Sequence, residues 1–235
     1  MKLINKLIAA IALTMGVSTA SAQNGLSIHA GNTFPIGAFS QGDKASDIAL
    51  NNISSSYGGA ATGFNVGAKV QLSILGDLSA FVEADFLYNG LKKELKKEGN
   101  DNSLPSYINM PVIGGVNYTL FEVLGTTFWA EAGVGMNFSK ITNSVSLNFS
   151  ESVLDISKEA NYDLTTSLAW KAGIGATIAN KFSLGAHYYG FGASNISGET
   201  TSSINMGNIT SDFKDSFSQG TLKTSMIVVR LGYHF

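Results

Sequence analysis

The chain has 235 residues, of which 44% are hydrophobic and 14% are charged, and it contains no cysteine. The charged fraction is well below the roughly 25% typical of soluble domains. The lack of cysteine excludes disulfides, thiolate metal sites and cysteine nucleophiles. The 15 basic and 17 acidic residues leave no basic excess that would indicate a nucleic-acid partner, and the composition predicts no cofactor or metal.

The first 22 residues have the pattern of a signal peptide. Lys2 and Lys6 precede an apolar stretch at residues 7–17, and Ala20 and Ala22 are spaced as before a cleavage site. The apolar stretch is shorter than the ~20 residues that a spanning helix needs. We therefore expect a cleaved signal peptide at 1–22 and one mature domain at 23–235.

The mature sequence alternates apolar and polar residues with a period of two. Successive side chains of a strand point to opposite faces, whereas a helix could not separate these two sets. In one segment, Phe64, Val66, Ala68 and Val70 alternate with Asn65, Gly67, Lys69 and Gln71. The same alternation predicts eight strands, which begin near residues 26, 58, 78, 108, 128, 164, 182 and 226.

The predicted connections alternate between long and short. The long connections are 40–57, 89–104, 139–161 and 194–220, and the short ones are 76–77, 119–125 and 179–181. Long loops at one end and tight turns at the other are the plan of outer-membrane barrels. The sequence thus predicts an all-β fold, an eight-stranded antiparallel up-and-down transmembrane β-barrel.

The composition of the two faces favours a membrane barrel over a soluble one. A soluble barrel places its apolar parity inside. The interior of an eight-stranded barrel, however, is only wide enough to be filled by side chains. The polar parity is rich in glycine and small residues that fit such a lumen, so we expect the large apolar parity to face lipid.

The C-terminal residues resemble a sorting signal. Residues 229–235, which include Leu231, Tyr233 and Phe235, are similar to the C-terminal signal of Gram-negative outer-membrane proteins. Four further stretches, at 32–37, 107–112, 129–135 and 186–191, resemble the outer-membrane β-barrel protein family, described as porin-family or PorT-like and similar in plan to OmpA- and OmpX-type barrels.

This resemblance implies a location in the Gram-negative outer membrane. It also implies export through the signal peptide, handling by periplasmic chaperones and insertion by the outer-membrane barrel assembly machinery, but it does not fix a substrate. The lipid partners would include the outer-leaflet glycolipid. Four lysines at positions 92, 93, 96 and 97 either contact its phosphates or form a solvated charged run. We expect a monomer.

Charged residues on the inward parity are the candidate site. They are three cations and three carboxylates: Lys69, Lys171 and Arg230 with Glu83, Asp85 and Glu131. Buried charges need paired partners because desolvating a lone ion costs several kcal/mol. We expect one network, in which Lys69 faces Glu83 across a hairpin.

Two functions remain open on the sequence alone. The first is a structural or surface-interaction barrel whose charge-paired interior is plugged. The second is a small porin-like channel for ions or small solutes. We expect no enzyme activity, because the chain has only 3 histidines and His187 falls on the inward parity, away from the lipid edge where a lipid hydrolase needs its Ser–His pair.

Overall fold

The computed structural model describes residues 25–42, 58–93, 106–142, 145–151, 154–206 and 209–235. The predicted signal peptide and Lys96 and Lys97 lie outside these residues. Among the described residues, no helix is long and apolar enough to cross a membrane.

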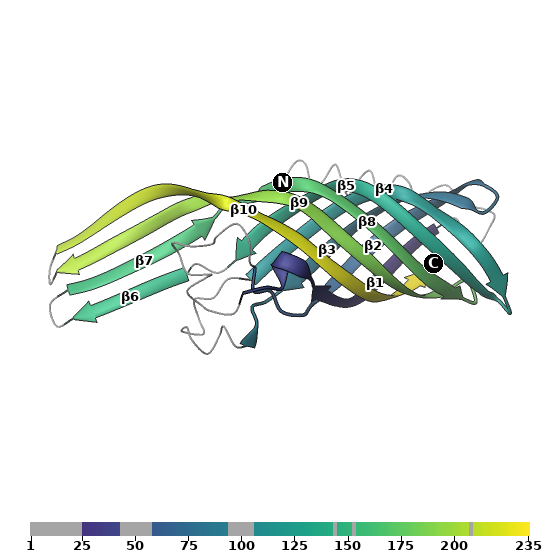
Figure 1. Ribbon diagram of the computed structural model, residues 1–235, viewed down its shortest axis with the longest axis horizontal. Coiled ribbons are helices and arrows are strands. Elements are labelled where there is room, and N and C mark those ends of the chain that lie inside the picture. The colour runs from purple at the N-terminus through teal and green to yellow at the C-terminus, as the bar shows by residue number, and fades with distance from the viewer. Residues whose placement is uncertain (1–24, 43–57, 94–105, 143–144, 152–153, 207–208) are drawn as a thin grey trace.

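Eight antiparallel strands form a closed ring (Figure 1). They are β1 (Gly25–Pro35), β2 (Gly63–Leu75), β3 (Leu78–Asn89), β4 (Ser106–Val123), β5 (Thr126–Thr142), β8 (Thr165–Ile178), β9 (Phe182–Met206) and β10 (Ile209–His234). Each strand pairs with its neighbour in the chain order of the ring, and β10 closes the ring by pairing with β1. The predicted eight-stranded up-and-down barrel is confirmed.

The polar residues of the alternating pattern face the lumen and the large apolar ones face outward, as the sequence predicted. Asn65 and Lys69 are buried in the lumen, whereas their neighbour Val66 is exposed on the outside. Val134, in the middle of β5, is 66% exposed. The outer surface is therefore a belt of Val, Leu, Ile and aromatic side chains. The interior holds the charged and polar side chains together with buried apolar ones such as Phe81, Leu87 and Ile113.

Tight turns join the strands at one end of the barrel. Gly76, Gly125 and Asn180 adopt positive φ angles of 52°, 74° and 56° in the three turns. Both ends of the described barrel chain meet at this turn end, where the Phe235 amide donates to the Leu26 carbonyl at 3.0 Å.

The other end carries more strand than the sequence predicted. Segments 139–161 and 194–220, which we predicted to be loops, contain β6 (Val145–Glu151), β7 (Leu154–Tyr162) and long extensions of β9 and β10. Together they form a four-stranded sheet in the order β6-β7-β9-β10 that projects beyond the ring (Figure 1). We call this end of the barrel, opposite the tight turns, the hairpin end. It also holds the short 3-10 helix η1 (Gly37–Phe39).

Candidate functional site: the barrel interior

Seven of the eight ring strands contribute charged or titratable side chains to the centre of the lumen. Lys69 comes from β2, Glu83 and Asp85 from β3, Glu131 from β5, Lys171 from β8 and Arg230 from β10. All six side chains are buried, and Glu83 is only 1% exposed. His29 on β1 and His187 and Tyr189 on β9 complete the cluster, which we call the central network.

Glu131 is one of two carboxylates on which the central network converges. Its oxygens lie 2.9 Å from the Lys69 Nζ and 2.7 Å from the Lys171 Nζ. The Asn117 amide donates to Glu131 Oε2 at 3.2 Å, and the His187 Nε2 lies 3.0 Å from Oε1. Charge-assisted hydrogen bonds of this kind are the strong ones, and together they offset the desolvation of the carboxylate.

Glu83 is the second point of convergence. Arg230 binds it through both terminal nitrogens, with Nη1–Oε1 at 2.8 Å and Nη2–Oε2 at 2.9 Å. The Lys171 Nζ lies 2.6 Å from Glu83 Oε2, and Lys171 therefore bridges Glu83 and Glu131. A planar guanidinium fork that matches a carboxylate in this way fixes both side chains.

The predicted Lys69–Glu83 ion pair is wrong in its partner. The two residues do lie opposite each other in the β2–β3 register. Lys69 nevertheless pairs with Glu131 across the lumen, because Arg230 and Lys171 already bind both oxygens of Glu83. The Lys69 ammonium also lies 5.4 Å from the centre of the Trp129 ring.

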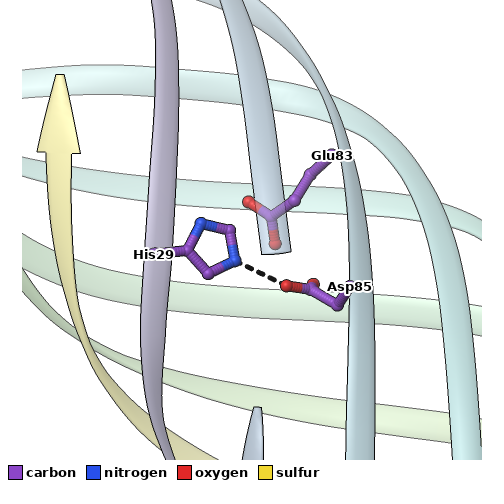
Figure 2. A group of neighbouring side chains, drawn as sticks. All are labelled: His29, Glu83 and Asp85. Carbon is purple, nitrogen blue, oxygen red and sulfur yellow. Dashed lines mark hydrogen bonds and ion pairs between the residues drawn. The ribbon is translucent and has the colours of Figure 1, made fainter. Parts of the chain in front are cut away.

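His29, Glu83 and Asp85 form a compact group that resembles a metal-ligand set (Figure 2). His29 Nε2 lies 2.5 Å from Asp85 Oδ1, which Figure 2 marks by a dashed line. The contact crosses β2, and Gly67 makes it possible, since a Cβ there would collide with both side chains.

Arg230 supplies the cation for this group. Its Nη1 lies 2.8 Å from Glu83 Oε1, 3.0 Å from His29 Nε2 and 3.7 Å from Asp85 Oδ1. The guanidinium nitrogen thus lies near an oxygen or nitrogen of all three residues. Because the chain already neutralises these ligands with its own side chain, the group does not fit a metal ion without displacing Arg230.

Hydrogen-bond geometry fixes the protonation of His187. Its Nε2 lies 3.0 Å from Glu131 Oε1 and 3.3 Å from Arg230 Nη2, and the nearer carboxylate favours a proton on Nε2, whereas its Nδ1 is buried without a partner among the described residues. A protonated imidazole would bury an unpaired N–H at Nδ1, so the neutral form fits this position. With neutral histidines, the three cations and three carboxylates of the central network balance.

Tyr189 is a member that the sequence reasoning missed. Its hydroxyl lies 2.8 Å from both Glu83 Oε1 and Asp85 Oδ2, and it therefore links the two carboxylates. A signal was present, because Tyr189 follows His187 by two positions and so shares its inward parity.

The hairpin end of the lumen is closed by a cap, which we define as residues 36–41 and 58–62. Phe39 is fully buried and packs edge-on against Tyr107 with ring centres 5.1 Å apart. The Tyr107 hydroxyl donates to the Gly58 carbonyl at 2.5 Å, and the Gly58 amide donates to the Ala38 carbonyl at 3.0 Å. A side chain at Gly58 would collide with Phe39. The sequence predicted that a strand begins near residue 58, but β2 begins at Gly63, because the amides of residues 58–60 bond to carbonyls of residues 38–41 in the cap.

The turn end of the lumen is open. A cavity of about 390 Å³ extends inward from the turns and is lined by polar side chains that include Ser27, Gln71 and Ser183. It ends on the central network at Lys69 and Arg230. The interior is therefore asymmetric, with a capped end, a charged centre and an open end.

The C-terminal residues that resemble a sorting signal lie on the outer face at the turn end. Leu231 is 67% exposed and Phe235 is 71% exposed. Tyr233 packs edge-on between Phe182 and Phe235, with ring centres 5.4 Å and 5.1 Å away. These residues form an aromatic group on the outside of the barrel and do not take part in the central network.

No protein-family model matches the chain, and no curated protein matches it. Among solved structures, it is similar to the Yersinia pestis outer membrane protein Ail, at 15% identity and a TM-score of 0.42 over 91% of this chain and 100% of that one. The outer membrane protein OprG of Pseudomonas aeruginosa gives 13% identity and 0.42 over 91% and 97%. Neisserial surface protein A gives 12% and 0.41 over 93% and 100%. We draw no assignment from similarities of this size.

Proposed function

We propose that the protein is an integral β-barrel of the Gram-negative outer membrane, with a plugged interior and a structural or surface-interaction role. The apolar belt supports the membrane location. Contiguous exposed apolar surface of this kind is unfavourable in water by roughly 25 cal/mol per Å². A closed ring leaves no unpaired strand edge in lipid. In this orientation, the hairpin end lies outside the cell and the turn end faces the periplasm.

The observation that carries the plugged-interior proposal is the central network. Glu83 and Glu131 are held by cations from β2, β8 and β10, so side chains cross the lumen from several walls. Opening a path through them would separate buried ion pairs, which is strongly unfavourable when one partner is left alone. The cap adds a second closure at the hairpin end. What remains for interaction is the projecting sheet.

A small channel for ions or solutes is the second candidate, and the open cavity favours it. A solute from the turn end meets polar walls as far as Lys69 and Arg230. Conduction through the whole barrel would then require both the central network and the cap to move.

Single-channel recording in planar bilayers separates the two candidates. We expect the purified wild-type barrel to give no steady openings. A Phe39→Ala variant, which weakens the cap but leaves the central network intact, should also be silent. Steady openings of the wild type would contradict the plugged barrel and support the channel. If the Phe39→Ala variant gave steady channel openings and the wild type did not, the cap would be the barrier to ions. That result would contradict a plug at the central network.

The proposal includes the partners expected for such a barrel. They are outer-membrane lipids with the outer-leaflet glycolipid, periplasmic chaperones and the barrel assembly machinery, and the protein would act as a monomer without catalysis. Exposure of Leu231 and Phe235 supports recognition of the C-terminal strand. Deleting Phe235 should lower the heat-modifiable, folded fraction in outer-membrane preparations, whereas the control Phe213→Ala in the projecting sheet should not. An unchanged yield after the deletion would contradict recognition through Phe235.

A further inference from the structure

The open cavity at the turn end differs from the rest of the interior in the charge of the residues that line its inner part. Two of the three cations of the central network, Lys69 and Arg230, line it. None of the three carboxylates does. The cavity thus meets the positive side of a network that is balanced as a whole.

The acidic groups on the cavity wall are at its mouth. They are Asp77 in the β2–β3 turn and Glu122 near the end of β4, and both are exposed. Exposed charges are screened by water and salt, whereas buried charges are screened much less. An anion inside the cavity would therefore be affected more by Lys69 and Arg230 than by the acidic mouth.

Residues on the cavity wall also have hydrogen-bonding capacity that no described residue uses. An ammonium has three N–H donors, and Lys69 uses one of them, toward Glu131, among its contacts with the described residues. His187 Nδ1 and His234 Nε2 are buried without a partner within the described part of the chain, and both residues line the cavity. A neutral imidazole nitrogen can donate or accept a hydrogen bond according to its tautomer. Buried polar atoms without a partner are rare in proteins and call for an explanation.

We propose that this cavity is a binding site for a small oxyanion, a solute that carries a phosphate or carboxylate group. Lys69 would hold the anion by a charge-assisted hydrogen bond, and Ser183 and Gln71 on the cavity wall would donate to its other oxygens. His187 Nδ1 accepts hydrogen bonds when Nε2 carries the proton, so it would not bind the anion. The volume of about 390 Å³ falls within the roughly 300–1,000 Å³ usual for small-molecule sites. In the proposed orientation the solute would enter from the periplasm, but binding itself does not depend on the membrane location.

The site provides its own fluorescent reporter. Trp129 is buried on the cavity wall, whereas the other tryptophan, Trp170, stacks on Tyr188 on the outer face. In a Trp170→Phe background, titration of the micelle-solubilised barrel with inorganic phosphate, and separately with succinate, should change the Trp129 emission with a single saturable binding curve. Glycerol, which is small and polar but uncharged, should not.

Two variants and one matched control test the site. Lys69→Met, which removes the charge, should weaken binding by about tenfold or more, as expected for the loss of a charge-assisted hydrogen bond. Gln71→Phe should have a similar effect by filling the cavity without changing any charge, and it leaves the central network intact if Lys69→Met fails to fold. Lys181→Met removes an exposed cation from the turn at the same end of the barrel, outside the cavity, and should bind like the wild type.

Three results would overturn the proposal. The first is the absence of saturable binding to the folded wild type at millimolar phosphate and succinate. The second is equal binding by the wild type and Gln71→Phe. The third is a response to short-chain phosphatidylglycerol without one to inorganic phosphate or succinate, which would replace the free solute by a lipid headgroup. Steady channel openings, or a location outside the outer membrane, would contradict the proposed function but would leave this binding test unaffected, so the two proposals fail separately.

Discussion

The hairpin end of the barrel is sealed, whereas the turn end holds an open, polar cavity. At the sealed end, Phe39 and Tyr107 exclude water, and backbone groups of the cap bond to one another and to Tyr107. At the open end, Lys69 and two imidazole nitrogens keep hydrogen-bonding capacity that no described residue uses. Among the described residues, the lumen is therefore a cavity that opens at the turn end and not a continuous pore.

The central network separates these two ends, and its removal should have the largest effect. Arg230→Met keeps a long side chain but leaves Glu83 without its bidentate partner and removes the cation beside His29 and Asp85. We expect a loss of about 3–5 kcal/mol in the free energy of unfolding, since a buried charge is left uncompensated. Urea unfolding in lipid vesicles measures it.

Arg230 is the only arginine in the sequence, so the matched control is Lys181→Met. It also replaces a cation by methionine, at an exposed turn where ion pairs contribute little. If Arg230→Met and Lys181→Met had the same free energy of unfolding, the central network would not stabilise the barrel.

The outer belt should give the next largest effect. Val134 lies in the middle of β5 and is 66% exposed on the outer face. Val134→Arg should lower the free energy of unfolding in lipid vesicles by about 2–4 kcal/mol, because it places a charge near the bilayer midplane. Val134→Leu is the matched control and should be nearly neutral. Equal stability of the two variants would contradict the assignment of this face to lipid.

The sequence predicted the ring but only one part of the projecting sheet, at residues 144–149, where Val145, Leu147 and Phe149 alternate and indicate a hairpin beyond the membrane. Period-two alternation of large apolar residues identified the strands that cross the belt, because lipid on one side and a polar lumen on the other impose the pattern. Segment 194–220 is rich in Ser, Thr and Asn and has no such alternation, so it was predicted to be a loop. Its strands are defined by backbone pairing between β9 and β10. The Gly207-Asn208 dipeptide is a hairpin signal in the sequence that the period argument overlooked.

Parity placed the charged residues of the interior on one face but could not choose their partners. Strand register puts Lys69 beside Glu83, yet long side chains reach across a narrow lumen to other strands. The choice depends on the curvature of the closed barrel and on competition from Arg230, neither of which can be read from local spacing. The cap was not predicted because a buried Phe39 in an irregular segment has no periodic signal.

Loosening the sealed end should have a smaller effect than breaking the centre. Tyr107→Phe removes the hydroxyl that donates to the Gly58 carbonyl and leaves the aromatic contact with Phe39. We expect a loss of about 1–3 kcal/mol, the range for a buried acceptor left without its partner. Hydrogen exchange should report faster exchange at the Gly58 and Ala60 amides, which bond within the cap, than in the wild type. Faster exchange across the whole barrel instead would mean that the cap is not a separate unit.

The smallest expected effect distinguishes the pairing that the structure contains from the one that the strand register suggests. Double-mutant cycles with Lys69→Met can be combined with Glu131→Gln or with Glu83→Gln. Lys69 donates to Glu131 at 2.9 Å, whereas its link to Glu83 runs through Glu131 and then through Lys171 or Arg230. We expect the Lys69–Glu131 interaction energy to exceed that of Lys69–Glu83 by about 1 kcal/mol, as direct contact couples more strongly than a shared network. Unfolding of the four single and double variants measures both energies. If the two interaction energies agree within about 0.5 kcal/mol, charge is shared evenly through the network and the direct Lys69–Glu131 pair has no special role.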